Sequence, residues 1–195
     1  MILSFPEGRF SAYLFDCDGT IANSLPVHQE AWRIALQKWN ASFPEDLFYA
    51  WGGIPVPKTV TMLNDHLGLN LPVKDVAHAR EQAYLNLIGT ITSHSEVEEV
   101  IRRQHGKLPM AVVSGSPRAS VEKTLRQLGL WEFFDIIVGA EDAKLGKPNP
   151  EPYLTAARLL NVEPKSCLVF EDAEPGIESA RAAGMAFVRI PQRPE

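Results

Sequence analysis

The chain is organised around one stretch, Tyr13-Leu14-Phe15-Asp16-Cys17-Asp18-Gly19-Thr20. A short apolar run followed by a glycine is typical of a buried strand and its exit turn. The turn carries two carboxylates, Asp16 and Asp18, one residue apart. Because such carboxylates repel each other, a protein that keeps both ionised needs a cation beside them. Oxygen ligands of this kind favour a hard ion such as Mg²⁺.

An Asp-x-Asp-Gly sequence is also common in ordinary surface turns, because Asp and Gly favour turns for local reasons. The stretch does not continue as an EF-hand calcium loop, which has its glycine at the sixth position and a glutamate at the twelfth. The catalytic interpretation and the simple turn therefore both stand, and the rest of the chain has to decide between them.

The composition is that of a globular protein of 195 residues, long enough for one domain with a large insertion. A net charge of −5 argues against a general nucleic-acid binder. Cys17 and Cys167 lie in apolar segments, which favours buried free thiols in a reducing cytoplasm. No segment has the apolar length of a membrane span, and residues 1–10 do not resemble a signal peptide. We expect a cytoplasmic protein without nucleic-acid or membrane partners; the oligomeric state stays open, a monomer included.

Residues 23–92 show helical patterns and no strand pattern. A helix is predicted from near Pro26 to Phe43-Pro44, with an apolar face that includes Trp32 and Trp39. Further helices are predicted over residues 58–67 and 74–88. We interpret the tryptophans of this segment as core residues rather than ligand contacts. The segment therefore reads as a small all-helical insertion.

The second half alternates strands with helices. Strands are predicted at residues 110–113, 136–138, 167–170 and 186–190, with helices over residues 116–128, 150–160 and 175–183. This alternation predicts a parallel sheet with helices on both faces, and the Asp16 strand has the same buried character.

Ligands of such sheets bind outside the carboxyl ends of the strands. Asp16 and Asp18 lie at one predicted strand end, Ser114-Gly115 at a second and Glu171-Asp172 at a third. Ser114-Gly115 precedes a helix N-terminus that would attract a phosphate, although a simple N-cap explains it as well. Glu171-Asp172 could equally be a favourable charge at a helix start, and Lys147 a solvated loop lysine. Their placement at strand ends favours one common site.

This ordered set resembles the haloacid-dehalogenase-like phosphohydrolases over nearly the whole chain. Further matches, such as His28-x-x-Ala31-Trp32-Arg33 and Phe170-Glu171-Asp172-Ala173, are similar to the β-phosphoglucomutase branch. The segment Arg181-Ala182-Ala183-Gly184-Met185 is similar to bacterial phosphatases acting on fructose 1-phosphate or 6-phosphogluconate. The resemblance implies a Rossmann-like catalytic core (residues 1–22 and 93–195) and a mobile helical cap (residues 23–92), which pivots near residues 23–25 and 90–95.

The resemblance also implies roles for the candidate residues. Asp16 would be the nucleophile that forms an aspartyl-phosphate, and Asp18 would protonate the leaving oxygen and then deprotonate water. Mg²⁺ would be bound by Asp16, the Asp18 backbone carbonyl and Asp172. Glu171 would be either a further ligand or a residue that positions the ligands. The phosphoryl group would be bound by Ser114, Gly115 and Lys147.

In the cap, His28 is expected to touch the substrate or Asp18, or to be a plain surface histidine. Lys58 is expected to meet a second anionic group on the sugar. The mutase pattern has an arginine where Val56 stands, which weakens the mutase alternative without removing it. The leading prediction is a Mg²⁺-dependent phosphatase of small phosphorylated metabolites. A β-phosphoglucomutase is the nearest alternative, and a non-catalytic module that binds phosphorylated ligands is an alternative of another class.

Overall fold

A computed structural model of the chain describes residues 3–191. Its strands are β1 (Ala12–Phe15), β2 (Met110–Val113), β3 (Ile136–Val138), β4 (Cys167–Glu171) and β5 (Ala186–Arg189). Its α-helices are α1 (Leu25–Gln37), α2 (Glu45–Ala50), α3 (Val56–Leu67), α4 (Val73–Leu87), α5 (Ser95–Gln104), α6 (Arg118–Gln127), α7 (Glu151–Leu159) and α8 (Glu174–Ala182). The residues at the two ends of the predicted core, 1–2 and 192–195, lie outside the described part.

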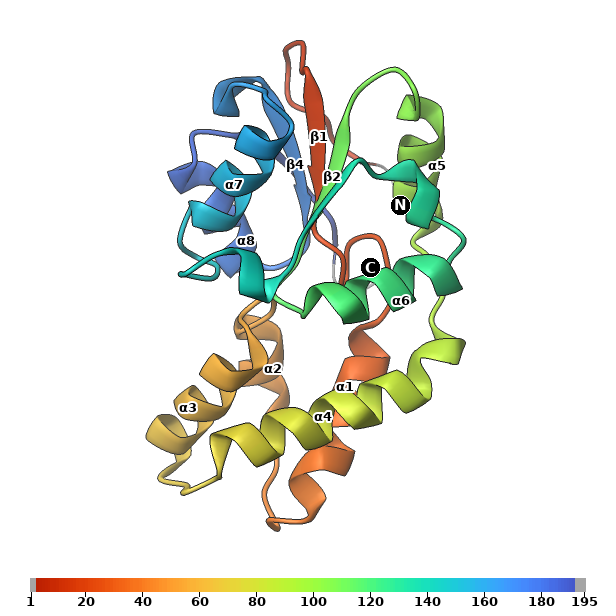
Figure 1. Cartoon of the computed structure of the whole chain (residues 1–195). Coiled ribbons are helices and arrows are strands. Elements are labelled where there is room, and N and C mark those ends of the chain that lie inside the picture. The colour runs from red at the N-terminus through yellow and green to blue at the C-terminus, as the bar shows by residue number, and fades with distance from the viewer. Residues whose placement is uncertain (1–2, 192–195) are drawn as a thin grey trace.

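The five strands form one parallel sheet in the order β3-β2-β1-β4-β5. Helices α5 and α6 cover one face, where Phe15 packs in a common cluster with Ile101 and Leu125. Helices α7 and α8 cover the other face, where Leu14 packs with Tyr153 (Figure 1). The predicted α/β fold is confirmed. Since β1 is central and has β2 and β4 on its two sides, the residues that follow these three strands meet at one edge.

Helices α1–α4 lie together beyond one end of the sheet (Figure 1). They have a hydrophobic cluster of their own, which includes Trp32, Leu36, Val60, Leu63 and Val76. Two chain connections join them to the sheet, and these run side by side: Ala22 and Ser93 form an antiparallel bridge, and the Asn23 N–H donates to the Thr92 carbonyl at 2.8 Å. The division into core and cap at these connections stays a prediction.

The structure differs from the predicted elements in three places. Helix α1 ends at Gln37 rather than at Phe43-Pro44, because the chain turns at Asn40, whose φ is 49°. Trp39 therefore lies beyond the helix, although it still packs against the same cluster. Helices α2 and α5 were not predicted. In the part of the chain that the structure describes, no helix is long and apolar enough to cross a membrane.

Helix α4 packs against α6 of the sheet layer through polar contacts. The Tyr84 hydroxyl and the Thr124 hydroxyl are 2.7 Å apart, and the Ser120 hydroxyl donates to Glu81. These contacts hold helix α4 against the sheet layer.

Replacing Leu63 by Ala is expected to destabilise the protein by about 2–5 kcal/mol, because Leu63 is completely buried in the helical cluster. Leu67→Ala, on the same helix but 38% exposed, is the matched control and is expected to cost less than about 1 kcal/mol. Urea unfolding of the two variants measures the difference. Equal costs would contradict the packing described for α3.

Candidate active site

The loop after β1 holds Asp16 buried at the edge of the sheet. It turns sharply at Gly19, whose φ is 92°, a conformation that favours glycine. A Cβ atom at Gly19 would lie 2.3 Å from Asp172 Oδ2, so only a glycine lets the Asp172 carboxylate pack against this loop. Thr20 donates from its hydroxyl to Asp172 Oδ1 at 3.0 Å and ties the ends of β1 and β4 together.

Three buried carboxylates meet at this edge. Asp16, Glu171 and Asp172 each offer an oxygen, and these three atoms lie within 4.8 Å of one another. The donor set consists of hard oxygen atoms alone, which fits Mg²⁺ or a similar divalent cation and does not suit a soft metal. The site predicted from the sequence therefore has a ligand set that a hard cation can use.

Lys147 is the buried cation of the cluster. Its ammonium donates to Asp16 Oδ1 at 2.7 Å, to Glu171 Oε1 at 2.5 Å and to the Val113 carbonyl at 3.0 Å, so each of its three protons has a partner. Burial disfavours the charged ammonium, but the two carboxylates outweigh burial and raise the pKa of Lys147 well above its usual value. Lys147 is not a solvated loop lysine.

One ammonium does not neutralise this cluster. Burial raises the pKa of Asp16 well above its usual range, Lys147 opposes that shift, and the neighbouring carboxylates Glu171, Asp172 and Asp18 add to it. The excess negative charge is what a bound divalent cation would offset.

Glu171 is held from several sides. Its Oε1 accepts from Lys147 and, at 3.1 Å, from the Tyr153 hydroxyl, while its Oε2 accepts from the Ala173 N–H at 3.0 Å. Both oxygens thus already have protein donors, which fits a residue that positions Lys147.

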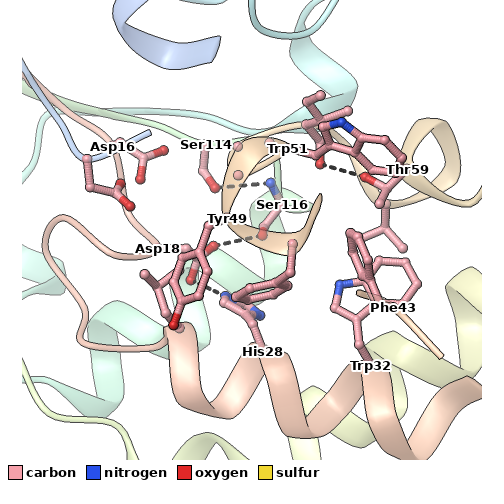
Figure 2. Close-up of a pocket in the computed structure, with 18 of the residues that line it drawn as sticks. Asp16, Asp18, His28, Trp32, Phe43, Tyr49, Trp51, Thr59, Ser114 and Ser116 are labelled. Atoms are coloured by element: carbon pink, nitrogen blue, oxygen red, sulfur yellow. Dashed lines mark hydrogen bonds and ion pairs between the residues drawn. The ribbon is translucent and has the colours of Figure 1, made fainter. Parts of the chain in front are cut away.

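Asp18 lines the same pocket, and its carboxylate contacts two hydroxyl donors and one imidazole. Its Oδ1 accepts from the Ser24 hydroxyl at 2.9 Å and lies 2.7 Å from His28 Nε2, and its Oδ2 accepts from the Ser116 hydroxyl at 2.8 Å (Figure 2). Burial alone would raise the pKa of Asp18, but His28, Ser116 and Arg80 lower it below its usual value. Asp18 is therefore a carboxylate whose orientation is set by both the loop and the cap.

His28 is buried, 4% exposed, and bridges Asp18 to Arg80. Arg80 donates to His28 Nδ1, and a guanidinium has no acceptor, so Nδ1 must carry the lone pair. The ring proton is thereby assigned to Nε2, the atom that lies 2.7 Å from Asp18 Oδ1. Burial, with the charge of Arg80, lowers the pKa of His28 and keeps the ring neutral against the opposing effect of Asp18. The ring also stacks on Tyr84, with centroids 4.4 Å apart.

Sequence reasoning missed Arg80 as a site residue. The sequence does contain a pattern that could have identified it, because Arg80 is a charged residue at a buried position of a helix. One face of α4 is buried, and it carries Val76, Arg80, Ala83 and Tyr84. A buried arginine needs hydrogen-bond partners. The Arg80 guanidinium donates to His28 Nδ1 and, at 3.5 Å, to the Glu81 carboxylate. The hydroxyls of Ser24 and Ser116, which hold Asp18, were missed as well.

Ser114 and Gly115, two of the three predicted phosphate-binding residues, lie directly after the end of β2. Ser114 is buried and accepts from the Ser116 N–H at 3.0 Å, which leaves its own proton for donation. The cap loop lies directly on Gly115 and Gly146: a Cβ atom at Gly115 would be 2.3 Å from the Gly53 carbonyl oxygen, and one at Gly146 would be 2.8 Å from Pro55 Cγ. Lys58, by contrast, is exposed on α3 and does not line the pocket.

The pocket between the sheet and helices α1–α4 is small, with a cavity volume of about 70 Å³. Asp16, Asp18, Ser114 and Ser116 lie on one side of it, and Trp32, Phe43, Trp51 and Thr59 on the other (Figure 2). Ligand pockets usually measure about 300–1,000 Å³, so this pocket is narrow for a substrate.

Comparison with known proteins agrees with this geometry. A sequence model described as haloacid dehalogenase-like hydrolase matches residues 10–184. Fructose-1-phosphate phosphatase YqaB of Escherichia coli is 34% identical over 182 residues, covering 93% of this chain and 97% of that protein. β-Phosphoglucomutase of Bacillus subtilis is 28% identical over 190 residues, covering 93% of this chain and 83% of that protein. The crystal structure of β-phosphoglucomutase from Clostridium difficile has a TM-score of 0.83 at 26% identity, covering 91% of this chain and 83% of that one.

The paired aspartates after β1, the buried lysine and the acidic end of β4 thus occur in a chain that matches this family over most of its length. The chain belongs to the haloacid dehalogenase-like hydrolases.

Proposed function

We propose that the protein is a Mg²⁺-dependent phosphatase of small sugar phosphates that works through an aspartyl-phosphate on Asp16. One observation carries the proposal: Asp16, Lys147 and Asp172, far apart in the sequence, lie in one buried cluster. The named phosphatase among the relatives supports the reaction type. A cytoplasmic location remains part of the same prediction.

In the proposed reaction, an Asp16 oxygen attacks phosphorus and the bond to the leaving alcohol breaks. Ser114, the Gly115 N–H and Lys147 are proposed to bind the phosphoryl oxygens and to hold attacking and leaving groups in line. Asp16, Asp172 and the Asp18 backbone carbonyl would hold the magnesium ion, and Glu171 would position Lys147. When bound, the ion supplies positive charge that lessens the repulsion between the carboxylate nucleophile and the phosphate.

Asp18 is proposed to carry the proton. It gives a proton to the leaving oxygen, and as a carboxylate it then takes one from the water that attacks the aspartyl-phosphate. The lowered pKa fits the second of these steps. A phosphate dianion arriving beside Asp18 shifts that pKa upward, which is the direction that the first step requires.

The mutase alternative uses the same aspartates but returns the phosphate to the sugar. The similarity to β-phosphoglucomutases in sequence and structure favours keeping it. Release of inorganic phosphate from fructose 1-phosphate supports the phosphatase, whereas formation of glucose 6-phosphate from β-glucose 1-phosphate supports the mutase. A module that only binds phosphorylated ligands would do neither.

Asp16→Asn is expected to lower turnover by roughly a thousandfold or more while the protein still folds, because an amide cannot act as the nucleophile. Phosphate release with Mg²⁺ and a circular dichroism melt measure the two effects. Asp65→Asn, at an exposed position of α3, is the matched control and should keep full activity. Near-normal turnover by Asp16→Asn would refute the nucleophile assignment.

Chelation of divalent cations is expected to abolish phosphate release, and added Mg²⁺ to restore it, because the three carboxylates cannot be balanced by Lys147 alone. Asp172→Ala should need at least about tenfold more Mg²⁺ for half-maximal activity. Titration of activity against Mg²⁺ measures both. Full activity after complete chelation would exclude the metal-dependent reaction.

Arg80→Met is expected to lower kcat about tenfold or more with little change in KM, because His28 loses the donor that fixes its tautomer. The ¹⁵N chemical shifts of His28 report the tautomer directly. In the wild type they should show Nε2 protonated and Nδ1 bare, and in Arg80→Met a mixture. A wild-type ring protonated at Nδ1 would contradict the assignment.

A further inference from the structure

The cap side of the pocket is an aromatic wall. Trp32, Phe43, Phe48, Tyr49 and Trp51 line it together. The rings contact one another edge to face or tilted: Phe43 lies 5.2 Å from Trp32, 5.7 Å from Phe48 and 5.8 Å from Trp51 between ring centroids. The wall is therefore already packed, and Trp32, Phe43 and Trp51 lie across the pocket from Asp16 and Asp18 (Figure 2).

This wall offers no cation to a ligand. Of the pocket-lining residues within 3–191, only Arg80 carries a permanent positive charge, and its side chain is 5% exposed. Its terminal nitrogens are directed to His28 and Glu81, and its Nε is buried without a partner in the described chain. The guanidinium also lies 5.8 Å from the centre of the Trp32 ring. Both terminal nitrogens of the guanidinium are thus already engaged by protein groups.

The other charged side chains that line the pocket, Asp16, Asp18 and Asp172, are acidic. The Asp18 carboxyl is oriented by hydrogen bonds from Ser24 and Ser116 and lies 2.7 Å from His28 Nε2. A second anionic group on the substrate would have to lie near this carboxylate, or lose its water against aromatic rings without gaining a partner. Both situations weaken binding, the first by charge repulsion and the second by uncompensated desolvation. An uncharged polyol avoids both penalties, and its C–H faces can pack on the rings.

We propose that the enzyme selects phosphate monoesters whose leaving alcohol is uncharged, and that it discriminates against phosphorylated acids and bisphosphates. The inference rests on the proposed phosphatase function and narrows its substrates. It favours the class of fructose 1-phosphate over the class of 6-phosphogluconate. It also disfavours a mutase, because an aspartyl-phosphate that reacts with a sugar monophosphate forms a bisphosphate, which this pocket would hold poorly.

Two matched substrate pairs test the proposal. Glucitol 6-phosphate and 6-phosphogluconate differ only in a hydroxymethyl group against a carboxylate, and fructose 1-phosphate and fructose 1,6-bisphosphate only in a hydroxyl against a second phosphate. With Mg²⁺ present, kcat/KM for phosphate release is expected to be about tenfold or more higher for the uncharged member of each pair. Equal or better turnover of the charged members overturns the proposal. No release from any of the four would instead contradict the phosphatase function itself.

Adding a positive charge to the pocket lining tests the proposal in the opposite direction, because it should favour the charged substrates. Val56 lines the pocket at the start of α3, so Val56→Lys is expected to raise the charged-to-uncharged ratio of kcat/KM by roughly tenfold. Val56→Met, of similar length without charge, should leave that ratio unchanged. If both variants shift it equally, pocket shape rather than charge selects the substrate, and the proposal is wrong. Should Val56→Lys fail to fold in a thermal melt, the wild-type pairs decide alone.

Lys58 supplies a second check on the same proposal. Because it is exposed and lies outside the pocket lining, Lys58→Ala is expected to leave the charged-to-uncharged ratio unchanged. A selective loss of activity toward 6-phosphogluconate or fructose 1,6-bisphosphate would mean that Lys58 reaches the second anion after all. That result would overturn the proposal and support the role expected for Lys58 from the sequence.

Discussion

The ammonium of Lys147, buried between Asp16 and Glu171, is the contact on which the site depends. Two carboxylates at the ends of adjacent strands, β1 and β4, would drive those strand ends apart if no cation lay between them. Lys147 connects both to the Val113 carbonyl at the end of β2. Three neighbouring strands are thus tied at their carboxyl ends by one side chain, and its removal would leave unpaired buried charges, which are among the costliest defects in a protein.

A second set of contacts joins the loop after β1 to the sheet layer and to helix α1. Asp18 contacts both layers: Ser116, which precedes α6 of the sheet layer, donates a hydrogen bond to it, and Nε2 of His28, on α1, lies 2.7 Å from it. The orientation of the Asp18 carboxylate is therefore set by contacts from both layers.

Much of this arrangement was predictable from the sequence. The carboxyl ends of parallel strands share one edge, so Asp16, Ser114 and Asp172 had to lie near one another once the strands were recognised. Contacts made across the cap were not predictable. Helical spacing tells which side of α4 is buried, but it does not tell that Arg80 on that side meets His28. For the same reason Trp32 was assigned to the core alone, whereas it packs in the helical cluster and also lines the pocket.

The loop that includes Gly53 and Pro55 lies very close to the sheet layer at two glycines. At Gly115 the opposing atom is the Gly53 carbonyl oxygen and at Gly146 it is the Pro55 ring, and neither position has room for a methyl group. An alanine at either position would act as a wedge and admit solvent between this loop and the sheet layer. The local dielectric constant around Asp16 would rise, and every charge interaction in the pocket would weaken accordingly. The strength of the charge interactions in this site thus depends on the lack of a Cβ atom at Gly115 and Gly146 as well as on the charged groups themselves.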